Sequence, residues 1–210
     1  MLDNKEIIIV GYSGHGLVVS DAALASEMNL KYYSEINEQI KNPYNLVYLG
    51  DENKEDFAGW NSENAFILGI GDNAIRYKIA HFILSKNKKI LNVIHPTASI
   101  SDNVLIGKGN FISKNTSINP LAQIGNFCII NTGAIIEHEC IISDAVHIAP
   151  GAVLAGNVKI GERSFVGANA VIKQDVTIGK DVIIGAGSVI INDVEDGQTV
   201  VGNPGRIILK

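Results

Sequence analysis

A six-residue repeat constrains the possible folds of this chain more than any other feature of its sequence. Every sixth position from Ile94 to Ile190 carries Ile, Val or Leu, and fifteen of these seventeen residues are Ile. Four positions after each stands, in most cases, a small or β-branched residue such as Ala98 or Cys128, with Asn110 as a larger polar exception. A period of six matches neither an α-helix nor a simple alternating strand. It predicts short strands separated by turns, three of which close a triangular coil of about eighteen residues.

The coils are expected to stack at the ordinary inter-strand spacing of ~4.8 Å. A helix is excluded, because the glycines that often follow the aliphatic residues would each cost ~1 kcal/mol in a helix interior. The pattern resembles that of the hexapeptide-repeat acyltransferases, which fold as left-handed parallel β-helices. The left hand, and trimers with active sites in the clefts between columns, are implied by this resemblance. A structural or ice-binding solenoid is the alternative interpretation.

The first part of the chain has a different character. A buried parallel strand is expected in "EIIIV", followed by the turn "GYSGHG" and a helix in "LVVSDAALASEMN". Further strands are expected in "NLVYLG" and "NAFILGIG", and an amphipathic helix in "DNAIRYKIAHFILSKNKK", with Ile75, Ile79, Phe82 and Ile83 on its apolar face. The predicted fold is therefore a small α/β Rossmann-like domain over residues 1–93 and a left-handed parallel β-helix over residues 94–210.

Composition excludes several classes of function. The net charge of −5 provides no basic footprint, so no nucleic-acid partner is expected. The apolar runs are too short for a membrane span, and the first residues lack the features of a signal peptide. Cys128 and Cys140 make no disulfide framework and are expected to pack in the core. The expected location is therefore the cytoplasm, and the spacing of the histidines and cysteines indicates no metal site.

The glycines at 11, 14 and 16 follow a strand and precede a helix. Glycines in such a turn allow a ligand phosphate to approach backbone N–H groups at a helix N-terminus. A turn that needs only a positive φ is the alternative. A dinucleotide site is disfavoured, because the α/β unit is short and lacks a second half that would hold a nicotinamide.

Three segments carry a closer resemblance: "GYSGHGLVVSD", "GIGDNAIRYKI" and "IEHECIISDAVHIAPGAVLAGNVKIG". They are similar to those of the bacterial nucleotide-sugar N-acetyltransferases, including enzymes of the bacillosamine, perosamine and viosamine pathways. The resemblance implies a homotrimer that transfers acetyl from acetyl-CoA to the 4-amino group of a nucleotide-linked amino-dideoxy sugar, with UDP favoured as the nucleotide. The alternatives are O-acetylation of a sugar or a serine, and a non-catalytic trimer that binds nucleotide sugar.

The sequence "EHE" is expected to carry the chemistry. The resemblance implies that His138 is the general base and that Glu139 holds its ring, although Glu137 is an alternative partner. A histidine with a pKa near ~6.5 is suited to accept the proton that an attacking amine loses. A carboxylate against one ring nitrogen fixes the tautomer and raises basicity. The alternative is that "EHE" has no catalytic role and is a solvent-exposed part of the column's outer surface.

The resemblance also implies residues for both substrates. Those expected to contact the nucleotide sugar lie in the first domain: Ser13, Gly14, His15, Ser34, Glu35 and Gly71. Of the two residues at the end of "KYYSE", only Glu35 is acidic, where relatives often show an acidic pair. Those expected to contact acetyl-CoA lie in the repeats: Asn131, His147, Gly167, Ala168, Gly185 and Ala186. Arg206 and Lys210 are further candidates for the CoA phosphates.

Overall fold

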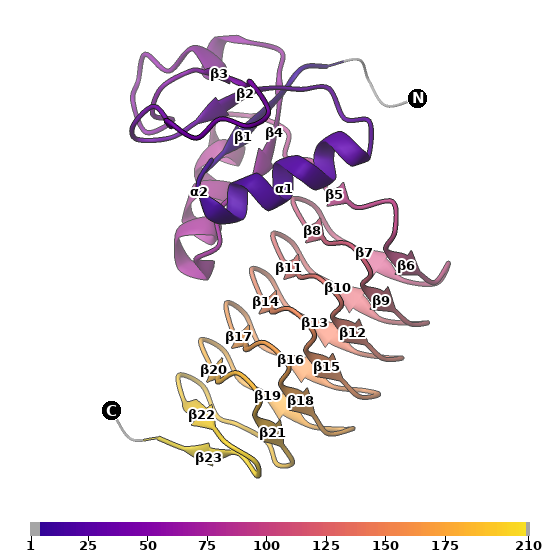
Figure 1. Cartoon of the computed structure of the whole chain (residues 1–210). Helices are drawn as coiled ribbons and strands as arrows, with labels where there is room; N and C mark the ends of the chain where they lie inside the picture. Colours follow the sequence, from indigo (N-terminus) through magenta and orange to yellow (C-terminus); the bar gives the residue numbers. More distant parts are fainter. Residues whose placement is uncertain (1–4, 209–210) are drawn as a thin grey trace.

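The computed structural model describes residues 5–208 and contains an α/β domain seated on one end of a triangular column (Figure 1). The domain has four parallel strands in the order β3-β2-β1-β4. Its elements are β1 (Ile7–Val10), α1 (Gly14–Ala25), β2 (Leu30–Ser34), β3 (Val47–Tyr48), the 3₁₀ helix η1 (Ala58–Asn61), β4 (Ala65–Leu68) and α2 (Asn73–Ser85).

Helices cover both faces of this sheet. Ile7 and Ile9 of β1 pack with α1, whereas Ile8 and Val10 pack with α2. The chain leaves β1 towards β2 on one side and returns to β4 on the other, so a topological switch point lies between β1 and β4. Such a point opens a crevice at the carboxyl ends of the strands, where α/β proteins bind ligands.

The structure of this domain adds one strand to those expected and corrects the expected apolar face of one helix. The segment "LKYYS" forms β2, which the sequence did not indicate because its apolar residues do not alternate regularly with its polar ones. Ile75 is 55 % exposed, and the buried stripe of α2 is instead Arg76, Ile79, Ala80 and Ile83. An arginine therefore occupies the position on the buried face that the sequence assigned to an isoleucine.

The column contains seventeen two-residue strands, and each ends at one of the seventeen periodic aliphatic residues. They form three parallel sheets. The first, called the docked face here, contains β5 (Val93–Ile94), β8 (Phe111–Ile112), β11 (Ile129–Ile130), β14 (His147–Ile148), β17 (Phe165–Val166) and β20 (Ile183–Ile184). The second face contains β6 (Ser99–Ile100), β9 (Ser117–Ile118), β12 (Ile135–Ile136), β15 (Val153–Leu154), β18 (Val171–Ile172) and β21 (Val189–Ile190). The third contains β7 (Leu105–Ile106), β10 (Gln123–Ile124), β13 (Ile141–Ile142), β16 (Lys159–Ile160) and β19 (Thr177–Ile178).

The predicted parallel β-helix is thus confirmed, and its end is closed by the C-terminal segment. The strand β22 (Thr199–Val201) extends the docked face in parallel, and β23 (Arg206–Ile207) pairs with it antiparallel. At the other end, β5 pairs with β8, so the hydrogen bonds of Val93 belong to the column. Ile90 still bridges to β4. The two parts of the chain therefore meet between residues 90 and 93.

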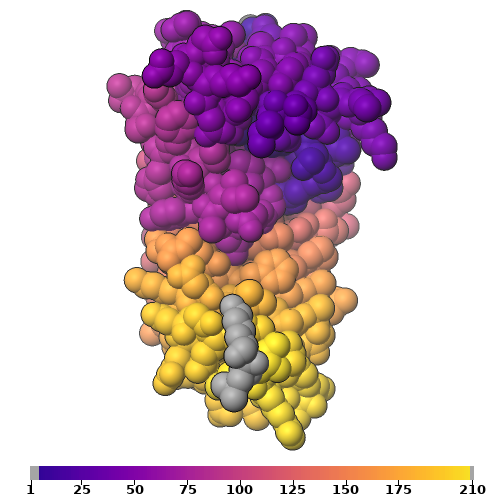
Figure 2. All heavy atoms as spheres, turned by 90° about the vertical axis from the view of Figure 1, so that its left-hand side faces the viewer, coloured from indigo at the N-terminus to yellow at the C-terminus, as the bar shows by residue number. Residues whose placement is uncertain are grey.

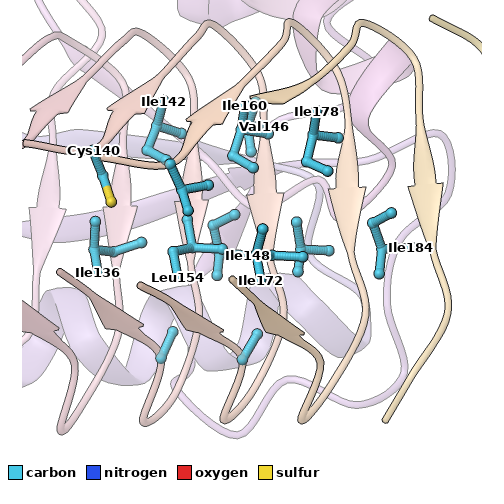
Figure 3. Close-up of a cluster of buried hydrophobic side chains, with 14 of the residues drawn as sticks. Ile136, Cys140, Ile142, Val146, Ile148, Leu154, Ile160, Ile172, Ile178 and Ile184 are labelled. Carbon is cyan, nitrogen blue, oxygen red and sulfur yellow. The ribbon is translucent and has the colours of Figure 1, made fainter. Parts of the chain in front are cut away.

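The aliphatic residues fill the interior of the column, as Figure 3 shows for Ile136, Ile142 and Ile148. Burying one such side chain contributes about 1.5–3 kcal/mol, so the stacked residues are the main source of stability. The exceptional Asn110 is 1 % exposed, but its amide donates to Gly125 O at 2.8 Å and accepts from Cys128 N at 2.7 Å. Both cysteines are free and fully buried, in agreement with their predicted place in the core.

The turns of the column share one backbone feature. From residue 109 to residue 187, every sixth residue, three places after an inward aliphatic residue, has a positive φ. Most of these residues are Gly, Asn or Asp, which tolerate the left-handed conformation. Leu121, Phe127, Glu139, Ala145 and Arg163 are the exceptions. An exception on the surface with no packing role is a reason to look for function.

The α/β domain packs on the docked face through the side of the domain that carries α1 and α2. Phe111 and Ile129 of this face join the α1-side core, and Phe127 joins the α2-side core. Figure 2 looks onto this side and shows magenta atoms around α2 reaching down to the orange coils, with the yellow coils below them. The edge between the second and third faces, called the far edge here, lies opposite the docked face.

The junction between the two parts is held by one buried cation. The guanidinium of Arg76, 1 % exposed, donates to Ile70 O and Gly71 O in its own domain, at 3.1 and 2.9 Å. It also donates to Phe127 O at 2.7 Å and Ala145 O at 2.9 Å in the column. Arg76 makes no ion pair with any carboxylate of residues 5–208. Besides these backbone carbonyls, its guanidinium donates to Asn73 Oδ1, at 2.8 Å.

Candidate active site

The histidine of "EHE" lies on the far edge, in the turn between β12 and β13. Its side chain is 51 % exposed, and its Nδ1 is 2.9 Å from Oε2 of Glu139, which is 56 % exposed. A carboxylate oxygen only accepts, so Nδ1 carries the proton and Nε2 keeps its lone pair. The structure therefore places Glu139, and not Glu137, against the ring, and leaves Nε2 free to accept a proton.

Glu139 has a φ of 62° at the turn position where most coils have Gly, Asn or Asp. Glutamate has no local preference for this conformation, which costs an L-residue about 1–2 kcal/mol. Its side chain has no packing role, because more than half of it is exposed. The conformation aims the carboxylate back at the imidazole that precedes it.

The second histidine of the repeats is held on the docked face. His147 is 9 % exposed, beneath the α/β domain, with its ring 6.1 Å from that of His15 and 5.0 Å from that of Phe165. Asn131 fixes its tautomer. The Asn131 Oδ1 accepts from Thr132 N at 2.8 Å, so Nδ2 is the atom that donates to His147 Nε2 at 3.2 Å. Asn131 and His147, each expected to contact acetyl-CoA, are therefore in contact with one another.

His15 is one of the residues expected to contact the nucleotide sugar, but its ring lies against the column. It is half-buried and turned towards the column, with its ring 5.5 Å from that of Phe111. Its buried Nε2 has no hydrogen-bond partner within the described residues. The orientation follows from the docking of α1 on the column, which the sequence of the loop does not encode.

Burial and a buried charge keep both imidazoles neutral. Desolvation, reinforced by the Arg76 guanidinium, lowers the pKa of His15 to about 4. The same two causes, in the same order, lower the pKa of His147 to about 3, although the backbone carbonyl of Gly71 opposes them. Desolvation also lowers the pKa of Arg76 itself, to about 10, so it stays charged at neutral pH.

These lowered pKa values predict a loss of stability in acid. The unfolded chain binds more protons than the folded one below pH ~6.5, so the stabilisation is present above that pH and is lost as the pH falls towards 4. At pH 5 the loss is about 2 kcal/mol for each of the two imidazoles. We expect His15→Gln to remove about half of this acid sensitivity in thermal unfolding between pH 8 and 5, because it deletes one of the two groups.

The exposed His81 on α2 supplies the control for this prediction. His81→Gln should keep the pH dependence of the natural chain. If His15→Gln and His81→Gln unfold with the same pH dependence, His15 is not a neutral buried imidazole and the assignment is wrong.

A cavity of ≈ 370 Å³, called the switch-point cavity here, opens at the carboxyl ends of β1 and β4. Of the residues expected to contact the nucleotide sugar, Ser13, Glu35 and Gly71 line it. Ser13 is the N-cap of α1, yet its side chain makes no capping hydrogen bond. The amides of the first turn of α1, beginning at the exposed Gly14, are therefore available to an anion.

The acidic wall of this cavity contains a residue that the sequence did not indicate. Glu52 lines the cavity beside Glu35 and is 7 % exposed. Ser34 is fully buried, and its hydroxyl lies 2.6 Å from Glu52 Oε2. The structure thus corrects the expectation for Ser34, because its hydroxyl faces a carboxylate and not a ligand. Glu35 and Glu52 are 17 positions apart in the sequence, and both line this cavity.

A second cavity of ≈ 420 Å³, called the junction cavity here, lies between the start of α2 and the docked face. Gly71 and Asp72 line both cavities, so the two are adjacent. Its column side is formed by Phe165, Ile183 and the pair of Arg163 and Asp181. The guanidinium holds that carboxylate through two bonds of 2.8 and 2.6 Å, which lower the pKa of Asp181. The repeat pattern alone gave no signal for this pair.

Four of the residues expected to contact CoA lie on the edge between the docked and second faces, in the turns after β17 and β20: Gly167, Ala168, Gly185 and Ala186. A Cβ added to Gly167 would lie 2.6 Å from Ala186 N, so its lack of a side chain is required by stacking alone. Ala186 is exposed and Ala168 half-buried. Their amides donate no hydrogen bond within residues 5–208. Arg206 is exposed at the start of β23, and Lys210 lies outside the described residues.

The described residues contain no group of three or more His, Cys, Asp or Glu side chains that could hold a metal ion. Within the same residues, neither helix has the length and apolar character needed to cross a bilayer.

One chain does not bring these parts together. His138 lies on the far edge of the column, whereas His147 and the junction cavity lie at the docked face, on the opposite side. His15 and the switch-point cavity belong to the α/β domain that packs on that face. The column interior between them is filled with aliphatic side chains (Figure 3). A ligand in either cavity therefore meets no imidazole from the far edge of the same chain.

Comparisons with known proteins identify the family of both parts of the chain. Residues 6–83 match the model of the PglD N-terminal domain, and residues 139–174 and 157–192 match that of the bacterial transferase hexapeptide. The crystal structure of PerB, a perosamine N-acetyltransferase from Caulobacter crescentus, in complex with CoA and GDP-perosamine, is 31 % identical. It superimposes with a TM-score of 0.93, and the match covers 100 % of both chains. The chain belongs to the hexapeptide-repeat nucleotide-sugar N-acetyltransferases.

Two further relatives extend this picture. The acetyltransferase domain of PglB from Neisseria gonorrhoeae FA1090, in complex with acetyl coenzyme A, is 31 % identical, with a TM-score of 0.91 and a match over 98 % of this chain and 100 % of that one. GDP-perosamine N-acetyltransferase from Escherichia coli O157:H7 is 36 % identical over 85 residues, which span 40 % of this chain but only 38 % of that enzyme. Members of the family are acetyl-CoA-dependent sugar N-acetyltransferases. The fold class predicted from the sequence, including its left hand, is that of the family.

Proposed function

We propose that this protein transfers the acetyl group of acetyl-CoA to the 4-amino group of a nucleotide-linked amino-dideoxy sugar. The observation that carries the proposal is the pairing of His138 and Glu139, which leaves Nε2 as a free base on an exposed edge. The diphosphate of the nucleotide sugar could bind in the switch-point cavity, where the N-terminal amides of α1 have no side-chain cap.

The chemistry requires one proton acceptor. The neutral sugar amine attacks the thioester carbonyl carbon, and a C–N bond forms. The nitrogen then gives a proton to Nε2 of His138, and Glu139 stabilises the imidazolium that results. The C–S bond breaks, and the CoA thiolate takes up a proton as it leaves. The imidazolium is the source of that proton, so the base is restored and the products are the N-acetyl sugar and CoA.

The active site is proposed to form between two copies in a trimer. The far edge of one column carries His138, and a neighbouring chain contributes its two cavities, His147 and Asn131. A closed ring of three gives every chain one partner on each side. The pantetheine arm would then lie along the edge with Ala168 and Ala186, whose free amides match an amide-rich chain.

The nucleobase is proposed to be selected by the acidic wall. Glu35 and Glu52 offer acceptors, which suit the N–H donors of uracil or of guanine. The segments quoted from the sequence favour UDP, whereas the similar Caulobacter crescentus enzyme binds GDP-perosamine. Calorimetry with UDP, GDP and dTDP separates these, and equal affinity for all three would contradict selection of the base by this wall.

An acceptor panel tests the activity. The protein is incubated with acetyl-CoA and matched amino and hydroxy nucleotide sugars, and thiol release is followed. Release only with the amino sugars is the expected result. Release with hydroxy sugars or serine would show an O-acetyltransferase instead, and binding without any release would show a non-catalytic protein. Either outcome overturns the proposal.

A further inference from the structure

The imidazole of His138 rests on a residue without a side chain. Gly156 stands one coil further along the far edge, and the adjacent Asn157 N donates to His138 O at 2.8 Å. A Cβ added to Gly156 would lie 2.5 Å from Cε1 and 2.6 Å from Nε2 of the ring. Real Cβ atoms essentially never come within 3.0 Å of another heavy atom. The ring therefore occupies the space that any side chain at this position would need.

Nothing else in the column requires this glycine. The positive φ of its turn falls on Asn157, at 57°, and Gly156 has no left-handed φ of its own. The three nearest atoms to its added Cβ are all atoms of the His138 ring. By contrast, a Cβ on Gly107 or Gly161 would lie within 2.5 to 2.8 Å of backbone atoms of the next coil. The backbone tolerates alanine at 156, and only the imidazole does not.

We propose that Gly156 is a positioning residue for the proton transfer, because its missing side chain allows the imidazole to lie against the far edge within reach of Glu139. The inference rests on the proposed function, since it assigns to His138 the role of base. A methyl group at 156 would push the ring outwards, and the 2.9 Å contact between Nδ1 and Glu139 would be lost or lengthened. A displacement of about 1 Å at a reacting group lowers the rate by roughly 100-fold.

The test is Gly156→Ala, measured for kcat, for KM of both substrates and for thermal midpoint. We expect kcat to fall by roughly 10- to 100-fold, with both KM values within about twofold and an unchanged midpoint, because the backbone and its amide stay in place. A crystal structure of the variant should show the ring displaced from its place over residue 156. Gln174→Ala, the exposed residue one coil further on the same edge, is the matched control and should behave as the natural chain.

Three results would overturn the inference: a kcat equal to that of the natural chain, a ring that has not moved, or a lowered midpoint with raised KM values, which would indicate damage to the fold. A parallel measurement of His138→Ala separates the two proposals. If His138→Ala is slow and Gly156→Ala is not, only the role of Gly156 fails. If His138→Ala turns over normally, the proposed function of His138 fails with it.

Discussion

Replacing His138 by alanine is expected to lower kcat by roughly 10²- to 10⁴-fold, which is the usual contribution of a positioned general base. The amine would then lose its proton only to water. The KM values should change little, because the ring accepts a proton in the transition state and does not hold either substrate. The thermal midpoint should also stay close to that of the natural chain, since half of the side chain is exposed. Steady-state thiol release with the preferred amino sugar measures the effect.

The neighbouring Glu137 provides the control for this variant. It lies beside the pair, but Glu139 makes the contact with the ring. Glu137→Ala should therefore retain most of the activity. An unchanged kcat in His138→Ala would contradict the assigned chemistry, whatever Glu137→Ala does.

Replacing Arg76 by methionine is expected to cost at least about 3 kcal/mol of stability. The guanidinium donates to four backbone carbonyls from two parts of the chain. Methionine fills much of the volume but donates to none of them, and each buried acceptor left without a partner costs about 1–3 kcal/mol. Thermal unfolding measures the loss, and Arg76→Lys should recover only part of it, because an ammonium lacks the planar fork of donors.

Lys78→Met is the control for Arg76→Met. Lys78 lies on the same helix, but it is exposed, so its replacement removes a positive charge without a buried contact. Equal thermal midpoints for Arg76→Met and Lys78→Met would show that the buried cation does not hold the α/β domain on the column.

The column was predictable from the sequence because its rule is local. Each inward residue is six places from the next, so the periodic series of Ile, Val and Leu predicts the position of all seventeen two-residue strands of the column. The pair of His138 and Glu139 was accessible for the same reason, since its two residues are adjacent. The resemblance of the quoted motifs added the chemistry to this geometry.

The features that escaped prediction depend on contacts between distant segments. Arg76 precedes Ile79 and Ile83 by three and seven residues, which is the spacing of one helical face. This spacing indicates burial, but a charged side chain is normally assigned to the exposed face. The inward turn of His15 arises only when α1 meets Phe111 of the column. Glu52 joins Glu35 through the parallel pairing of β2 and β3, which the sequence did not indicate.

Mixed oligomers test the central claim that the base and the nucleotide pocket of one active site belong to different chains. His138→Ala lacks the base, and Ser13→Trp fills the switch-point cavity with an indole ring. Ser13 is suited to this change because its side chain is exposed and makes no capping hydrogen bond to α1. Each variant alone should be inactive. The two are co-expressed with different tags, and oligomers that carry both are purified and assayed. About one site in three should be active in such a trimer, because one contact unites an intact His138 with an intact pocket. Mixed oligomers no more active than either parent would contradict the shared site.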